Sequence, residues 1–476
     1  MVTFAIALVV LILGYVFYGK FIEKFFGADG SRPVPSATMA DGVDFIAMPA
    51  WKAYMIQFLN IAGLGPIFGA IMGAKYGTAS YLWIVLGTIF AGSVHDYLSG
   101  MISLRNGGES LPQLVGRYLG DNIRKVFTLF TMLLLVLVTA VFVSQPADLL
   151  DSLTGGKIGT IWWIVIIFVY YFVATLFPID KVIGKLYPIF GAALLFMALG
   201  IMASLFVRHP QLPEMWNGLG TKYESNPIFP MMFVSIACGA ISGFHATQSP
   251  LMARCLTNEK KGRPVFYGAM ISEGIVALVW AAAATAYFGE KGADASAAQI
   301  VMEISKTWLG KLGGVLAVLG VVAAPVSTGD TALRSARLIV ADFFHMRQKT
   351  VRSRLVVSIP IVIVTLIFLF YSLRDKDGFN VIWRYFAWSN QTLSVFTLWA
   401  LTVYFEQKGK NLLVTMIPAL FMTFVTSVYI LMAKEGLKLP PVLAYSLGAA
   451  FTAFIWMVFM QWRFHFRKGD LDTREK

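Results

Sequence analysis

The sequence has few charged residues and almost no cysteine. Only 14% of its 476 residues are Asp, Glu, Lys or Arg, whereas 57% are hydrophobic. This balance excludes a soluble protein, and the apolar runs are too long and continuous for the strands of a membrane barrel. The two cysteines, Cys238 and Cys255, lie on one segment, too far apart for a disulfide if that segment is even partly helical. We interpret both as packing residues.

Motifs for catalysis and signalling are also missing. The sequence has no nucleophile motif, no HExxH run and no paired cysteines. The stretch Ser327-Thr328-Gly329-Asp330 has no matched second aspartate on a neighbouring span, so a membrane enzyme is disfavoured. A signalling domain would not fit between the apolar segments, which disfavours a sensor. The first segment has neither a basic leader nor a small-residue cleavage site, and we expect a retained helix.

The apolar runs predict thirteen membrane-spanning helices that take up most of the chain. Their expected ranges are 3–18, 52–74, 78–103, 123–144, 160–177, 184–207, 230–256, 264–288, 312–341, 355–372, 383–405, 411–432 and 441–462.

The net charge of +13 has a simple source in a membrane protein. When the connections are assigned alternately to the two sides, one side holds most of the Lys and Arg residues, as the positive-inside rule requires. We therefore expect a multi-pass protein of the bacterial inner membrane, with the N-terminus outside and the tail from Arg463 to Lys476 in the cytoplasm. Lipid is the expected surface partner, and nucleic acid is not needed to explain the charge.

The second predicted span, residues 52–74, is interrupted at its centre by Gly63-Leu64-Gly65-Pro66. Pro66 cannot donate a backbone hydrogen bond, and the two glycines adopt unusual dihedrals at little cost. We expect this helix to open at mid-membrane. Lipid cannot satisfy the freed amides and carbonyls, so the break must face protein, water or a ligand.

The seventh predicted span, residues 230–256, is interrupted in the same way. Glycines, Pro250 and polar side chains crowd its middle. Interrupted helices at matching places in two halves of a chain indicate the binding site of a secondary transporter. Glycine and proline also aid close packing in membrane helices, so either break alone would be weak support.

Spans 2–6 and 7–11 form two sets of five helices. Because five is odd, the second set starts on the opposite side of the membrane and is inverted relative to the first. Each set starts with an interrupted helix, and the next helix carries an acid. We predict an all-α polytopic protein with an inverted 5+5 repeat of the LeuT type. The expected parts are an N-terminal helix and connection (1–50), a first repeat (51–207), a second repeat (228–407) and two further helices with the tail (408–476).

The two breaks predict the substrate site. Free amides at the start of a half-helix attract an anionic group such as a carboxylate. Polar residues in the eleventh span can hydrogen-bond the substrate or brace the cavity. The predicted substrate-binding residues are Gly63, Gly65, Pro66, Ser242, Gly243, His245, Thr247, Gln248, Asn390 and Gln391.

A coupling-ion site is predicted in the middle of the ninth span. The hydroxyls of Ser327 and Thr328, with carbonyls near Ala62 and Gly65, would form an oxygen cage for Na⁺. Asp330 could instead bind and release a proton. The structural alternative is that the hydroxyls bond their own helix and that Asp330 pairs with Arg334 one turn later.

Three further polar residues share one predicted depth in the membrane: His95, Asp96 and Glu273. They can form a proton relay, a structural bridge or a small site for a divalent metal ion. The sequence predicts no organic cofactor and leaves the oligomeric state open.

Several motifs resemble those of the carbon starvation protein A family. They are IAGLGP (61–66), FAGSVHD (90–96), CGAISGFHATQSP (238–250), RYFAWSNQ (384–391) and DGVDF (41–45). The resemblance covers most of the chain. It implies an inner-membrane protein that takes up peptides, or in related members pyruvate with protons, when carbon is scarce.

This sequence departs from that family at one place and is also shorter than its larger members. Those members tend to carry two histidines before the first break, where this chain has Ile56 and Gln57. We expect a proton- or sodium-coupled importer of a small carboxylate-bearing nutrient, with peptide as the first candidate and pyruvate as the second. A channel is the rival, and it would not drive uptake uphill.

Replacing Gly65 by leucine is expected to leave expression intact and to abolish uptake, because the side chain would fill the break. Uptake of labelled substrate by cells that express Gly65→Leu measures this. Normal uptake would argue against a site at the break.

Overall fold

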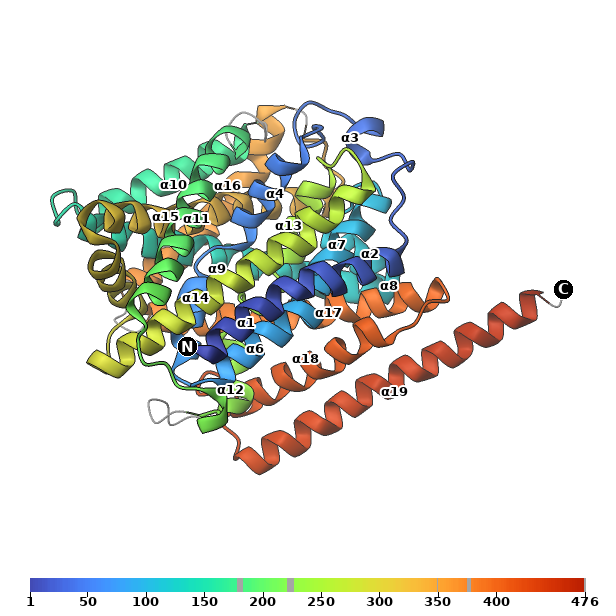
Figure 1. Ribbon diagram of the computed structural model, residues 1–476. Coiled ribbons are helices and arrows are strands. Elements are labelled where there is room, and N and C mark those ends of the chain that lie inside the picture. Colours follow the sequence, from blue (N-terminus) through green and yellow to red (C-terminus); the bar gives the residue numbers. More distant parts are fainter. Residues whose placement is uncertain (178–182, 221–226, 349, 375–377, 475–476) are drawn as a thin grey trace.

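The computed structural model describes residues 1–177, 183–220, 227–348, 350–374 and 378–474, and every regular element within these ranges is a helix (Figure 1). The last two residues of the predicted cytoplasmic tail lie outside the described residues. Helices suit lipid because each satisfies its own backbone hydrogen bonds.

The N-terminal helices and the first predicted repeat occupy the chain up to Arg208. Their bounds are α1 (Val2–Leu13), η1 (Gly14–Tyr18), α2 (Gly19–Phe26), α3 (Pro35–Thr38), α4 (Ala50–Ile61), η2 (Gly65–Gly69), α5 (Ala70–Ala74), α6 (Ala79–Gly87), η3 (Thr88–Gly92), α7 (Ser93–Arg105), α8 (Leu111–Leu119), α9 (Asp121–Leu153), α10 (Thr160–Leu176) and α11 (Ile183–Arg208).

The second predicted repeat and the C-terminal helices follow. Their bounds are η4 (Met215–Asn217), α12 (Ile228–Ser235), α13 (His245–Ala253), η5 (Glu259–Lys261), η6 (Arg263–Tyr267), α14 (Gly268–Lys291), α15 (Ala297–Phe343), α16 (Val351–Arg374), α17 (Gly378–Gln407), α18 (Leu413–Met432) and α19 (Pro441–Arg474). The division into four parts at residues 50, 207, 228 and 407 stays a prediction.

Each predicted span coincides with a helix or a helix pair. Within the described residues, eight helices are long and apolar enough to cross a membrane, and the pair α4 with η2–α5, bent by 56°, makes a ninth. The other four predicted spans fall on α6–η3–α7, α10, the broken pair α12 and α13, and α17. These are shorter, broken or more polar, which is where functional residues of a transporter are expected.

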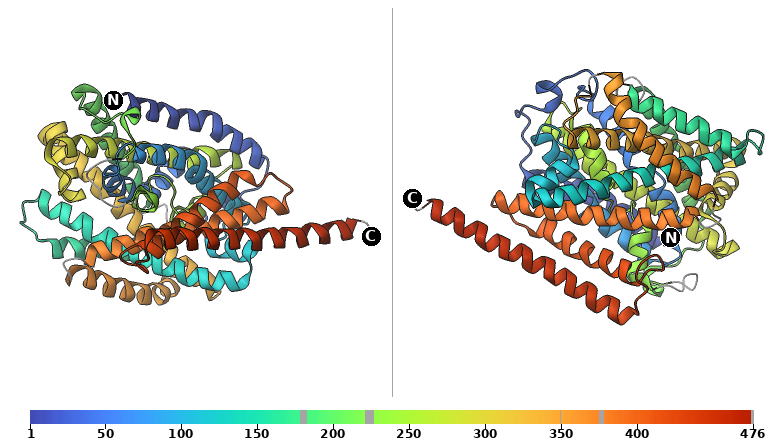
Figure 2. Two further views of the ribbon diagram at one scale, coloured as in Figure 1. Left: turned by 90° about the horizontal axis from the view of Figure 1, so that it is seen from below. Right: turned by 180° about the vertical axis from the view of Figure 1, so that it is seen from behind.

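Two groups of helices surround the interrupted crossings. In the first group, α14 packs against α4, η2 and α5, and α13 packs against α4 and α7. In the second group, the long α15 packs against α9, α10, α11 and α16. At one edge α17 contacts α18, and α18 contacts α19. Figures 1 and 2 show α19 on the outer side of α18, extending beyond the rest of the bundle.

Small residues bring the first group into close contact. A Cβ atom on Gly92, at the end of η3, would lie 2.2 Å from the carbonyl oxygen of Ala240. One on Gly87 would lie 2.8 Å from the Cβ of Ala240. In lipid, where helix association relies on close packing, small residues let backbones approach. The second interrupted crossing is therefore pressed directly against η3.

Replacing Gly92 by alanine is expected to lower the free energy of unfolding by about 1–3 kcal/mol, because the new methyl group meets backbone that cannot turn aside. Thermal unfolding of the purified protein in detergent measures the loss. Gly289→Ala is the matched control, since a Cβ at this exposed position in α14 meets no atom within 4 Å. Equal stability of the two variants would contradict the close contact.

Candidate functional site

The first break lies where the sequence predicted it. Helix α4 ends at Ile61, and helical structure resumes at Gly65. The amide of Gly63 donates to the carbonyl of Ile61 at 2.8 Å, and not to that of Leu59 as in an α-helix. The Leu59 carbonyl is thereby freed for a partner on another helix.

The second break lies upstream of the predicted centre. Helix α12 ends at Ser235 and α13 begins at His245, so residues 236–244 are not helical. Ser242 and Gly243 lie in the break as predicted. Thr247 and Gln248, which the sequence predicted as substrate-binding residues, lie in the first turns of α13 and not in the break. Their local hydrogen bonds explain the difference: the Thr247 hydroxyl and amide both donate to the carbonyl of Phe244.

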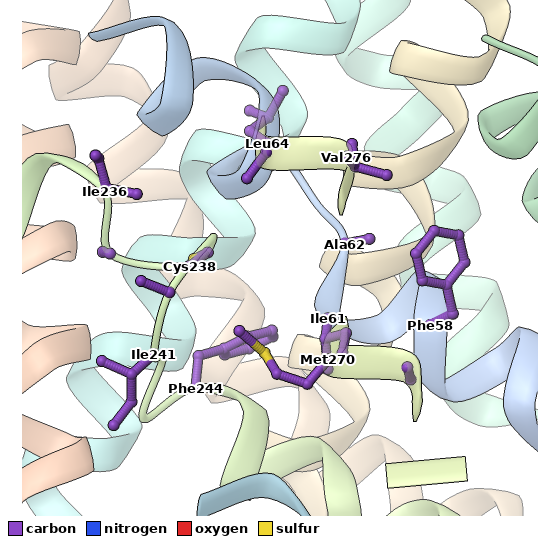
Figure 3. Packing of buried hydrophobic residues seen from close by; sticks show 14 of the residues in the cluster. Phe58, Ile61, Ala62, Leu64, Ile236, Cys238, Ile241, Phe244, Met270 and Val276 are labelled. Atoms are coloured by element: carbon purple, nitrogen blue, oxygen red, sulfur yellow. The ribbon is translucent and has the colours of Figure 1, made fainter. Parts of the chain in front are cut away.

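The two breaks pack against each other. A Cβ atom on Gly65 would lie 2.2 Å from the Cβ of Cys238, and one on Gly69 would lie 2.8 Å from the carbonyl oxygen of Ser235. A Cβ atom on Gly239 would lie 3.7 Å from the Cα of Pro66. Figure 3 shows both breaks as thin, unwound traces, one marked by Ala62 and Leu64 and the other by Cys238 and Ile241. Glycine is required here because any side chain would separate the two backbones.

Asn390 on α17 closes the second break. Its side-chain oxygen accepts from the Phe244 amide at 2.7 Å and from the Ser242 hydroxyl at 2.9 Å, and its carbonyl accepts from the Gly243 amide at 3.1 Å. The neighbouring side chain of Gln391 donates to the carbonyl of Ile241 at 3.1 Å. The expectation that the second break offers free amides is therefore wrong for Gly243 and Phe244, because both amides donate hydrogen bonds to oxygen atoms of Asn390.

Oxygen atoms from α4 and α15 meet beside the first break. The Thr328 hydroxyl lies 2.9 Å from the carbonyl oxygen of Leu59 and 3.0 Å from that of Ala324. The Ser327 hydroxyl lies 2.7 Å from the carbonyl oxygen of Ala324 and 3.4 Å from that of Leu59. The hydroxyls thus bond their own helix and also reach α4. The carbonyl that they reach is that of Leu59, three residues before Ala62, and the predicted ion site stays a prediction.

Asp330 is bound by two tyrosines and not by Arg334. Its carboxylate accepts from the hydroxyl of Tyr187 at 2.6 Å and from that of Tyr170 at 2.7 Å. The alternative that paired Asp330 with Arg334 is wrong, because Arg334 instead bonds Asp44 at 3.2 Å and the carbonyls of α10's C-terminal end.

Asp44 is the centre of a buried ionic cluster in the connection before α4. Arg334 and Arg337 are fully buried and lie 3.2 and 3.7 Å from its carboxylate. Burial alone would raise the pKa of Asp44, but the charges of Arg334, Arg337, Arg254 and Arg354 outweigh it and lower the pKa. The carboxylate therefore stays ionised and ties α15 to the connection before the first break.

His245 joins the acids that the sequence placed at one depth. The Asp96 carboxylate lies 2.8 Å from Nδ1 of His95 on one side and 2.8 Å from Nδ1 of His245 on the other. Nε2 of His245 lies 3.4 Å from the carboxylate of Glu273. All four side chains are completely buried. The predicted trio of His95, Asp96 and Glu273 is thus connected through a residue that the sequence had assigned to the substrate.

Sequence reasoning missed several residues around the breaks. Gln57 and Asn60, three residues apart on α4, are fully buried, and their side-chain amides have no hydrogen-bond partner among the described residues. Polar residues just before a break were the available signal. Tyr170 and Tyr187 gave no signal, because they belong to elements far from the breaks in sequence. Asp44 belongs to the DGVDF motif, but nothing in that motif shows that its carboxylate meets Arg334 and Arg337 on α15.

A large cavity lies away from the breaks. It has a volume of about 1020 Å³, and α8, α17, α18 and α19 line it with side chains such as Trp388, Phe396, Phe451 and Trp462. Its lining is mainly apolar and it faces α19 at the edge of the bundle, as expected for a surface covered by lipid. Gly63, Gly65, Ser242 and His245, in contrast, are buried.

Comparison with known proteins places the chain in a family. The family model of carbon starvation protein CstA matches residues 1–162, 157–312 and 292–429. An uncharacterized membrane protein of Haemophilus influenzae is 42% identical, in an alignment that covers 60% of this chain and 91% of that protein.

Two relatives have named activities. A peptide transporter CstA of Helicobacter pylori is 26% identical over 56% of this chain and 48% of its own length. The pyruvate/proton symporter BtsT of Escherichia coli is 25% identical over 58% of this chain and 48% of its own length. This chain thus spans about half the length of these two relatives.

Solved structures confirm the predicted fold class. The chain resembles a manganese transporter of Eremococcus coleocola with a TM-score of 0.57 and 15% identity, covering 90% of this chain and 98% of that one. It resembles Mhp1, a nucleobase-cation-symport-1 family transporter, with a TM-score of 0.57 and 13% identity, covering 89% and 95%. The architecture is therefore the LeuT-like inverted repeat, with one helix before it and two after it.

Replacing Asn390 by alanine is expected to lower the free energy of unfolding by about 1–3 kcal/mol, because it leaves the buried Phe244 amide without an acceptor. Thermal unfolding in detergent measures this loss. Thr392→Val is the control, since within the described part of the chain the Thr392 hydroxyl bonds only the carbonyl of Trp388 on its own helix. If both variants lose the same stability, Asn390 does not brace the break.

Proposed function

This chain belongs to the carbon starvation protein CstA family, and we propose that it is a secondary active transporter that imports a small carboxylate-bearing nutrient during carbon starvation. Peptides are the first candidate substrate. Pyruvate taken up with protons is the second. The protein would lie in a bacterial inner membrane with its N-terminus outside and its C-terminus in the cytoplasm.

One observation carries this proposal: two interrupted crossings pack against each other at Gly65 and Cys238 inside a LeuT-like fold. In this architecture, substrate and coupling ions bind at mid-membrane between such helices, and one group of helices rocks against the other. The glycine contacts permit that motion, because they hold the breaks together without large side chains.

The chemistry of the buried groups supports a small polar substrate. The side-chain amides of Gln57 and Asn60 on α4 have no partner within the described residues, and an unpaired buried amide is costly unless a ligand completes it. Helix starts attract carboxylates, and η2 begins at Gly65 in the first break. The relatives named as peptide transporters and as a pyruvate symporter all handle substrates with a carboxylate.

Na⁺ is the coupling ion that the site geometry favours. The hydroxyls of Ser327 and Thr328 each lie within 3.4 Å of both the Leu59 and the Ala324 carbonyl oxygens. Oxygen atoms of this kind are the ligands that hard cations prefer. The ion would join α4 to α15 and thereby couple its binding to the position of the first break.

A proton is the second candidate for the coupling ion. Asp330 is the carboxylate that would carry it, because the hydroxyls of Tyr170 and Tyr187 hold it at mid-helix on α15. The pyruvate/proton symporter among the relatives favours this alternative.

The Asp44 cluster would close the cytoplasmic end of the pathway. Arg254, which follows α13, donates to the carbonyl of Gly108 and approaches Asp342, so this end is tied by several elements. In the proposed topology these residues all lie on the cytoplasmic side. Release of substrate would require Asp44 to separate from Arg334 and Arg337.

Purified protein in proteoliposomes is expected to accumulate labelled peptide or pyruvate when an inward Na⁺ gradient is imposed. Thr328→Val is expected to raise the Na⁺ concentration for half-maximal uptake about tenfold or more, since about 1.4 kcal/mol of lost binding is tenfold. Thr331→Val is the matched control, because among the described residues the Thr331 hydroxyl bonds only carbonyls of its own helix.

Other outcomes of this assay decide between the rivals. If a proton gradient drives uptake and Asp330→Asn abolishes it, the coupling ion is H⁺ and not Na⁺. Uptake that never exceeds the external concentration under any gradient would indicate a channel. No uptake of either substrate class under either gradient would contradict the proposal.

A further inference from the structure

We propose that Cys238, His245 and Glu273 form a binding site for one transition-metal ion, Zn²⁺ or a similar divalent cation, where the two interrupted crossings meet. The three residues come from the second break, from α13 and from α14. This inference goes beyond the proposed transport function and does not depend on it.

The three ligand atoms converge. Sγ of Cys238, a ring nitrogen of His245 and a carboxylate oxygen of Glu273 all lie within 4.8 Å of one another. A tetrahedral zinc ion, with bonds of about 2.0 Å to nitrogen and oxygen and about 2.3 Å to sulfur, sets its ligand atoms roughly 3.5 Å apart. A movement of about 1 Å or less would complete such a site.

The converging atoms lack other partners. Nε2 of His245 and both carboxylate oxygens of Glu273 have no hydrogen-bond partner in the part of the chain that the structure describes. Both side chains are completely buried, and Cys238 is 3% exposed. Buried polar atoms are normally hydrogen-bonded. Nε2 of His245 and the Glu273 carboxylate instead approach each other only to 3.4 Å, and this gap points to a missing ligand between them.

The neighbours of these residues orient them as metal ligands. Nδ1 of His245 lies 2.8 Å from the Asp96 carboxylate, which leaves Nε2 free to face Glu273 and Cys238. Histidines that bind metal ions almost always donate their other ring N–H to a carboxylate or carbonyl in this way. On the sulfur side, the Asn390 amide donates to Sγ of Cys238 at 3.3 Å, an interaction that stabilises a thiolate.

Charge also favours a cation. Among the described ion pairs, Asp96 and Glu273 have only histidines as partners, and no lysine or arginine reaches either acid. Two buried carboxylates without a cation are costly. A divalent ion would balance the Glu273 carboxylate and the Cys238 thiolate, whose proton is released to solvent on binding.

The ligand types identify the class of metal. A sulfur, a nitrogen and an oxygen ligand suit Zn²⁺ and its neighbours in the first transition series and disfavour Mg²⁺ and Ca²⁺, which require oxygen ligands. Three protein ligands leave one position open for water or for a carboxylate. Gly65 keeps space at the sulfur, because a Cβ there would lie 2.3 Å from Sγ.

Cobalt is a suitable probe, because a thiolate bound to Co²⁺ absorbs strongly in the near ultraviolet. Metal-free purified protein in detergent is titrated with Co²⁺ alone. Cys255→Ser, which leaves Cys238 as the single thiol, is expected to bind one equivalent of Co²⁺ with this absorption. Cys238→Ser is expected to lose it. Asp96→Asn is expected to keep it while weakening Co²⁺ binding about 10- to 100-fold, since Asp96 only positions His245.

Size-exclusion chromatography and thermal unfolding show that each variant is folded. If Cys238→Ser does not fold, protection of the single thiol of Cys255→Ser from alkylation by equimolar Zn²⁺ takes its place. Folded Cys255→Ser protein that neither binds Co²⁺ through sulfur nor gains protection from Zn²⁺ would overturn the proposal. It would leave His95, Asp96, His245 and Glu273 as a structural polar bridge without a metal ion. None of these outcomes depends on transport.

Discussion

A backbone that unwinds inside a bilayer must find its hydrogen-bond partners within the protein, since lipid offers none. In this chain two crossings unwind, and each finds partners on a particular neighbouring helix. The carbonyl freed at Leu59 accepts from Thr328 on α15. The amides of Gly243 and Phe244 donate to Asn390 on α17. The positions of α15 and α17 follow from this requirement.

The same requirement explains the use of small residues and of buried charges. Glycines at 65, 69 and 92 let the unwound backbones approach their neighbours without side chains between them. Among the buried acids, Asp330 accepts from two tyrosine hydroxyls and Asp96 lies against two histidines, whereas Glu273 has only a 3.4 Å contact to His245. The protein around the two breaks is therefore rich in polar groups and yet closely packed, which suits a site that forms around a small ligand.

The sequence predicted the helices, their order and both breaks, because long apolar runs and the residues Gly63 to Pro66 carry local signals. It could not predict which distant residues meet. His245 was assigned to the substrate site, although its ring lies between Asp96 and Glu273. Asp330 has Arg334 one turn later, but two tyrosines from α10 and α11 reach it first. Cys238 resembled a packing residue, since nothing in its local sequence shows that His245 and Glu273 lie nearby.

A structure determined with saturating substrate tests the central claim most directly. The account predicts substrate density between the breaks at residues 62–65 and 236–244. Its carboxylate would lie near a helix start or near the proposed metal site at Cys238, and its polar groups would contact Gln57 or Asn60. Density only in the groove between α17 and α19, with both breaks unchanged, would contradict a binding site formed by the two unwound crossings.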